Sequence, residues 1–166
     1  MMKRPLAALV AVALGAALAM PSAFAADDSK EFIEKAVRGN IAEVKLGELA
    51  EKQATSEQVK TLGQTLQADH GKALKASEAV AKEVGVSVPK EPTEDGREIH
   101  ERLAKMSGAA FDKAFVAAAV KDHEKDIELY TEQAEEGDNP KVVEYAKETL
   151  PVLKKHLDAA RKLENN

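Results

Sequence analysis

Three histidines and one glutamate are placed where this chain could bind a metal ion. Glu43, His70, His123 and His156 each lie at the centre of the apolar stripe of a different predicted helix. An amphipathic helix normally turns its charged side chains to solvent, and a buried carboxylate or imidazole is costly without a partner. Facing helices of a bundle can bring such ligands to one point. We therefore expect a site for one divalent transition metal (zinc, copper, iron or manganese), with zinc slightly favoured.

The neighbours of the four residues on the same helix faces are small or apolar. They include Phe32 and Ala50 beside Glu43, Leu66 and Leu74 beside His70, Val116 and Ile127 beside His123, and Val152 and Ala160 beside His156. Counted from the predicted hairpin turns at 1.5 Å per residue, partners within each hairpin differ in height by at most about 6 Å. His100, the remaining histidine, lies in a short connecting segment and shares none of these features.

Three aspartates lie close to the histidines in the sequence. Asp69 and Asp122 each precede a histidine, and Asp126 follows His123 by one helical turn. Metal-bound imidazoles usually donate their second N–H group to a carboxylate or a carbonyl. We expect the aspartates to accept these bonds, and Asp126, nearest in angle to the core, could also be a ligand. A solvated helix edge or a salt bridge with lysine is the alternative for all three.

Two other functions remain open. The histidines could be metal-free core residues that bond to one another, to Glu43 and to Thr149 or Ser77, in a structural or interaction module of the cell envelope. An enzyme would need a metal-bound water at an open coordination position. The chain has no cysteine, and its isolated serines predict no nucleophile, so an enzyme is the weaker alternative.

Helix start and stop patterns divide the chain into elements that would position these residues. A capping pattern at Asp28 and Glu31 precedes the first long helix, and two prolines, Pro89 and Pro92, exclude helix from the middle of the chain. Pro140 suits the first turn of the last helix. The expected helices are about residues 29–54, 56–85, 95–106, 109–136 and 140–163, with Thr55 and Asp95 as caps of the second and third.

The order of these helices predicts the fold. Two hairpins of long helices are joined by a connector of about twenty residues that contains a short helix. This arrangement predicts an all-α, ferritin-like four-helix bundle with one long crossover. Residues 26–166 are enough for one such domain with its own core.

The first 25 residues have the pattern of a secretory signal peptide. Lys3 and Arg4 precede an apolar run over residues 6–20, and Ala23-Phe24-Ala25 is a cleavage pattern. The run is shorter than the roughly 20 residues that span a bilayer. We expect cleavage after Ala25, a periplasmic or secreted protein and no integral membrane segment afterwards, with an uncleaved anchor as the alternative.

The charge balance argues against nucleic acid as a partner. Without Lys3 and Arg4, 22 basic residues stand against 29 acidic ones, a net charge near −7. An acidic surface without a basic patch repels phosphate backbones and anionic lipids, and it attracts cations weakly.

Several spaced motifs resemble one known family. They are NIAEVKLGELA (40–50), ADH (68–70), SGAAFD (107–112), KDH (121–123) and TLPVLKKHL (149–157). Together they are similar to the exported bacterial family named domain of unknown function 4142 (DUF4142), placed in the ferritin-like superfamily. The resemblance covers about residues 28–163 and implies an exported four-helix bundle, but no established activity.

The chain departs from ferritins at the motif that holds their iron. Di-iron carboxylate sites use two Glu-x-x-His motifs and two further glutamates. Here the residues three positions before the histidines are Gln67, Val120 and Leu153. A dinuclear, oxygen-activating centre is therefore not expected, and a site for a single ion fits better.

Overall fold

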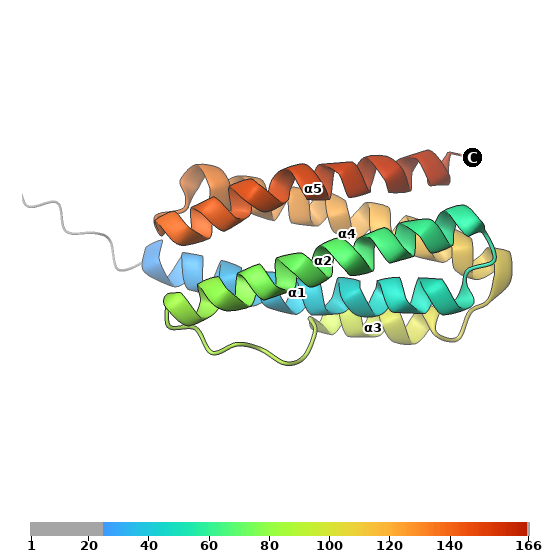
Figure 1. Ribbon diagram of the computed structural model, residues 1–166, viewed down its shortest axis with the longest axis horizontal. Helices are drawn as coiled ribbons and strands as arrows, with labels where there is room; N and C mark the ends of the chain where they lie inside the picture. Colours follow the sequence, from blue (N-terminus) through green and yellow to red (C-terminus); the bar gives the residue numbers. More distant parts are fainter. Residues whose placement is uncertain (1–24, 166) are drawn as a thin grey trace, which may run out of the picture.

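Five helices form a four-helix bundle with a long connection in the computed structural model, which describes residues 25–165 (Figure 1). They are α1 (Ala25–Gln53), α2 (Glu57–Glu83), α3 (Glu94–Leu103), α4 (Gly108–Glu136) and α5 (Pro140–Glu164). The hairpins α1–α2 and α4–α5 pack together, and α3 lies in the connection that returns along the bundle. Because of this return, α2 and α4 run in the same direction (Figure 1). The predicted all-α, ferritin-like connectivity is confirmed.

The helix bounds agree with the predicted ones to within a few residues, but three predicted caps are wrong. Asp28, predicted to cap the first long helix, lies inside α1, which already includes Ala25. Thr93, not Asp95, caps α3, because its Oγ1 accepts the N–H of Gly96 at 3.1 Å. The prediction that Thr55 caps α2 also fails, because its hydroxyl donates to Asp112 instead, at 2.7 Å. Residues 1–24, most of the predicted signal peptide, lie outside the described residues.

Asp112 of α4 holds the turn between α1 and α2. Its carboxylate accepts the backbone N–H groups of Thr55 and Ser56 at 3.0 and 2.9 Å. Ser56, the N-cap residue of α2, makes no capping bond with its own side chain. The carboxylate from the other hairpin therefore fixes the backbone of the turn that leads into α2.

Helices α1 and α2 approach each other most closely at two glycines. A Cβ atom added to Gly47 would lie 2.6 Å from the carbonyl oxygen of Gly63, and one added to Gly63 would lie 2.6 Å from Cβ of Ala50. Only glycine permits this backbone approach. It sets the spacing of the two helices within two turns of Glu43 and His70.

The apolar core has two parts, one towards each end of the bundle. One includes Leu46, Leu66, Phe111, Phe115 and Leu157. The other includes Phe32, Val37, Tyr130, Tyr145 and Leu153. In each long helix, buried polar residues lie between the members of these two clusters: Asn40 and Glu43 in α1, His70 in α2, His123 in α4 and His156 in α5, whereas the buried polar residues Ser29, Gln133 and Thr149 lie elsewhere. A polar layer thus divides the core.

None of the helices within residues 25–165 has the length and apolar character that crossing a membrane requires.

Candidate metal centre

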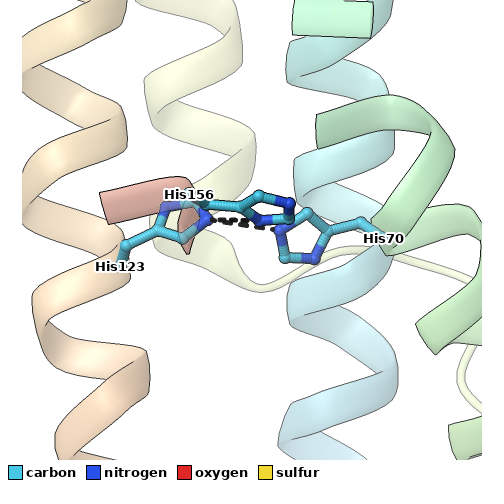
Figure 2. A group of neighbouring side chains, drawn as sticks. All are labelled: His70, His123 and His156. Carbon is cyan, nitrogen blue, oxygen red and sulfur yellow. Dashed lines mark hydrogen bonds between the residues drawn. The ribbon is translucent and has the colours of Figure 1, made fainter. Parts of the chain in front are cut away.

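The polar layer brings three of the four predicted ligands together. His70, His123 and His156 have 3%, 0% and 3% of their surface exposed. Nε2 of His123 lies 3.4 Å from Nε2 of His70 and 3.3 Å from Nδ1 of His156, and the three nitrogens all lie within 4.8 Å of one another. Figure 2 shows the three rings, from α2, α4 and α5, meeting between the helices. The structure thus brings these three histidines together, and their role as metal ligands stays a prediction.

The outer nitrogen of His123 is bound to the backbone. Its Nδ1 lies 2.9 Å from the carbonyl oxygen of Ala119, one turn earlier in α4. A carbonyl oxygen can only accept, so Nδ1 carries the proton and donates it. Nε2 of the neutral ring then has a free lone pair, and this atom is the one that faces the other two histidines.

The outer nitrogen of His70 is bound to Asn40 of α1. The Asn40 amide donates from Nδ2 to the carbonyl oxygen of Ala36 at 2.8 Å and to the hydroxyl of Tyr145 at 3.0 Å. Because the Ala36 carbonyl oxygen can only accept, the NH₂ group of Asn40 must face it. Oδ1 of Asn40 therefore faces Nδ1 of His70, at 2.9 Å. His70 therefore donates from Nδ1, and its Nε2 carries a lone pair towards the centre.

Asp69 accepts a hydrogen bond from His156. The sequence predicted that Asp69 accepts a bond from an imidazole, but this imidazole is not that of the neighbouring His70. Oδ2 of Asp69 lies 3.3 Å from Nε2 of His156, across the interface of α2 and α5. A hydrogen bond from Lys72 holds the pKa of Asp69 below its ordinary value against the effect of burial, so the carboxylate is charged and accepts. Nδ1 of His156 then keeps its lone pair and faces His123.

These tautomers direct three lone pairs to one point. Two neutral imidazoles cannot hydrogen-bond through two lone pairs, so with these tautomers the three inward nitrogens do not satisfy one another. Burial lowers the pKa of His70, His123 and His156. The three rings are therefore neutral near pH 7, in the state that binds metal ions.

Glu43 belongs to the same layer but not to the group of three nitrogens. It is 4% exposed, and its side chain lies on a pocket together with Asp122 and Asp126. Burial, and next the nearby Asp122 carboxylate, raise the pKa of Glu43 from 4.5 to about 8. The role of Glu43 as a fourth ligand stays a prediction.

Asp122 and Asp126 make no hydrogen bond to an imidazole within residues 25–165. The acceptors for the outer nitrogens of His70 and His123 are Asn40 and the Ala119 carbonyl instead. Sequence reasoning missed Asn40 as a site residue. Its position one turn before Glu43, on the same buried face of α1, could have drawn attention to it.

Comparison with known proteins identifies the family. Residues 15–163 match the family model described as "Domain of unknown function (DUF4142)". The chain belongs to the DUF4142 family. This DUF4142 chain is similar in fold to a crystal structure of a DUF305 fragment from Deinococcus radiodurans, with a TM-score of 0.73 and 11% identity over 83% of this chain and 95% of that one. At this identity the likeness concerns the fold alone, and no curated protein matches the chain.

Proposed function

We propose that this protein binds one transition metal ion through Nε2 of His70, Nε2 of His123 and Nδ1 of His156. The observation that carries the proposal is the set of three inward lone pairs, each fixed by an acceptor at the opposite ring nitrogen. Such acceptors orient metal-bound imidazoles in known sites and increase their basicity. A proton is a poorer occupant, because burial lowers the pKa of all three rings.

The spacing of two of the three nitrogen pairs supports zinc as the first ion to test. Two nitrogens at about 2.05 Å from a tetrahedral zinc lie about 3.3 Å from each other. The contacts of His123 with His156 and His70 measure 3.3 and 3.4 Å. Three imidazoles also suit copper and iron, and the fourth position is open for water.

The test is a titration of the purified, metal-stripped protein with zinc, copper(II) and iron(II), followed by thermal unfolding. We expect at least one ion to raise the melting temperature and His123→Gln to abolish the rise. His100→Gln is the matched control, because His100 lies on α3 outside the centre. If no ion raises the melting temperature of the wild type, the proposal is wrong.

A metal-free core is the competing function, and its prediction is opposite. In a structural module the histidines would only fill the bundle, and apolar replacements of buried polar groups are often neutral or stabilising. His123→Leu would then leave the protein as stable as the wild type with or without metal. A metal-dependent difference between the two proteins supports the metal site.

We also propose that residues 1–25 export the protein and that it serves metal handling or envelope stress. The N-terminal pattern and the acidic balance of the remaining chain support this. Cell fractionation and N-terminal sequencing of the native protein test it. We expect a periplasmic or secreted chain that begins at Ala26, and a full-length cytoplasmic chain would contradict export.

A further inference from the structure

A pocket of about 510 Å³ lies between α1, the start of α3 and α4. Three carboxyl groups line it from the bundle side: Glu43 of α1 and Asp122 and Asp126 of α4. The two aspartates are four residues apart and thus on one face of α4. The pocket lies beside the three histidines, because His123 is between the two aspartates in sequence, but none of the histidines lines it.

The other acidic residues of the pocket have basic partners. Glu94 pairs with Arg97, and Asp95 pairs with Lys125 at 3.7 Å. Lys35, which also lines the pocket, pairs with Glu31 at 2.5 Å. The basic groups at the rim are thus already paired with rim or surface carboxylates.

The three inner carboxyl groups are not paired. Within residues 25–165, Glu43, Asp122 and Asp126 take part in no hydrogen bond and no ion pair. Glu43 is the most notable of them, because a carboxyl group that is 4% exposed is normally bonded. An unpartnered, buried carboxyl group facing an open pocket is the environment that a bound cation would satisfy.

We infer that this pocket binds one hydrated divalent cation of the hard class, Mn²⁺ or Mg²⁺, through the carboxyl groups of Glu43, Asp122 and Asp126. Hard cations prefer carboxylate oxygen and water to imidazole. Within the described chain these oxygens are not gathered as closely as the three histidine nitrogens. A small hard cation tolerates this, because it keeps several waters and binds through few carboxylates. The site is separate from the histidine centre and does not depend on it.

The test is a titration of the purified, metal-stripped protein with Mn²⁺, in which electron paramagnetic resonance measures the free ion. We expect one bound Mn²⁺ per chain, and at least a tenfold weaker affinity in Glu43→Gln. Glu94→Gln is the matched control, since this rim residue is already paired with Arg97. Its affinity should equal that of the wild type. Mg²⁺ should compete with Mn²⁺ for the site.

The variant His70→Gln tests whether the carboxylate pocket and the histidine centre bind metal independently. If the pocket is a site of its own, this variant binds Mn²⁺ as the wild type does, even when it no longer binds zinc. If His70→Gln and Glu43→Gln lose Mn²⁺ equally, the ion lies at one mixed site and the inference is wrong. Absence of Mn²⁺ binding to the wild type, or normal binding to Glu43→Gln, overturns it as well. Asp126→Asn provides the same test if Glu43→Gln does not fold.

Discussion

Asn40 orients His70 without facing the centre itself. Its amide contacts Ala36, Tyr145 and His70, so the orientation of the amide decides which nitrogen of His70 is protonated. The phenol of Tyr145 is in turn 3.3 Å from that of Tyr130. A buried chain of polar groups therefore extends from the histidines into the apolar cluster at one end of the bundle.

Replacement of Asn40 by alanine should weaken metal binding more than it disturbs the fold. Loss of an acceptor behind a metal-bound imidazole typically costs about 10- to 100-fold in affinity. The unpaired His70 N–H should cost about 1–3 kcal/mol of stability. Competition with a chromophoric chelator measures the affinity. Tyr145→Phe is the control, because it keeps Oδ1 of Asn40 in place, and equal affinities of Asn40→Ala and the wild type would contradict the assigned tautomer.

Glu43 should make the protein less stable as the pH rises. The pKa of Glu43 is about 8 in the folded chain and near 4.5 when unfolded. The protonated form of Glu43 makes its whole contribution to the free energy of unfolding below pH 4.5. This contribution decreases as the pH rises towards 8, by up to about 1.4 kcal/mol per pH unit. Urea unfolding of metal-free protein between pH 5 and 8 should show a smaller loss of stability with rising pH in Glu43→Gln than in the wild type. Glu51→Gln, at an exposed position of α1, should show the same loss as the wild type.

At the scale of the elements, the crossing of α1 and α2 determines whether Asn40 reaches His70. Gly47→Ala would place a methyl group 2.6 Å from the Gly63 carbonyl oxygen, a backbone atom that cannot move alone. We expect a loss of roughly 1–3 kcal/mol or more in the free energy of unfolding, measured by urea denaturation.

Gly71→Ala is the matched comparison on α2. Its added methyl group would meet no atom within 4 Å, and alanine in a helix interior is favoured over glycine by about 0.5–1 kcal/mol. This variant should be more stable than the wild type. If the two glycine variants behave alike, close approach of the helices is not what glycine provides at position 47.

The helices themselves were predictable because their signals are local. Paired prolines, the Gly137–Pro140 break and the apolar periodicity lie in short stretches of chain, and the observed bounds follow them. The cap of α2 was not predictable in the same way. The group that satisfies Thr55 and Ser56 is Asp112, more than fifty residues away on another helix.

At the scale of the whole molecule, the three histidines should make the metal-free fold sensitive to acid. Burial lowers their pKa values in the folded chain, whereas the unfolded chain binds protons near pH 6.5. The neutral rings make their whole contribution to the free energy of unfolding above about pH 6.5, and this contribution is lost as the pH falls below that value. Burial raises the pKa of Asp126 to about 7, which has the opposite effect on stability. In a Glu43→Gln and Asp126→Asn background, urea unfolding should therefore show the loss between pH 7.5 and 5.

A second substitution and added metal test the origin of that loss. His123→Gln should make the pH dependence shallower, since one fewer proton is taken up on unfolding. Saturating zinc should stabilise the protein most at neutral pH and less in acid, because protons compete for the same nitrogens. A pH dependence that is unchanged by His123→Gln would contradict neutral, buried histidines.

The sequence alone determined that four polar side chains lie on the core faces of four helices at similar heights. The angle and the rise of a residue depend only on its own helix, and counting both was sufficient to predict that the three histidines meet. The spaced motifs also indicated the DUF4142 family.

Only the tertiary structure decided which partner each polar group has. Consecutive residues of a helix point about 100° apart, so Asp69 turns away from His70 and reaches His156 of α5. Glu43 likewise faces a pocket beside α3 and α4 rather than the three nitrogens. Such partners depend on the rotation and spacing of neighbouring helices to within an ångström or so, and periodicity along one helix carries no information about these quantities.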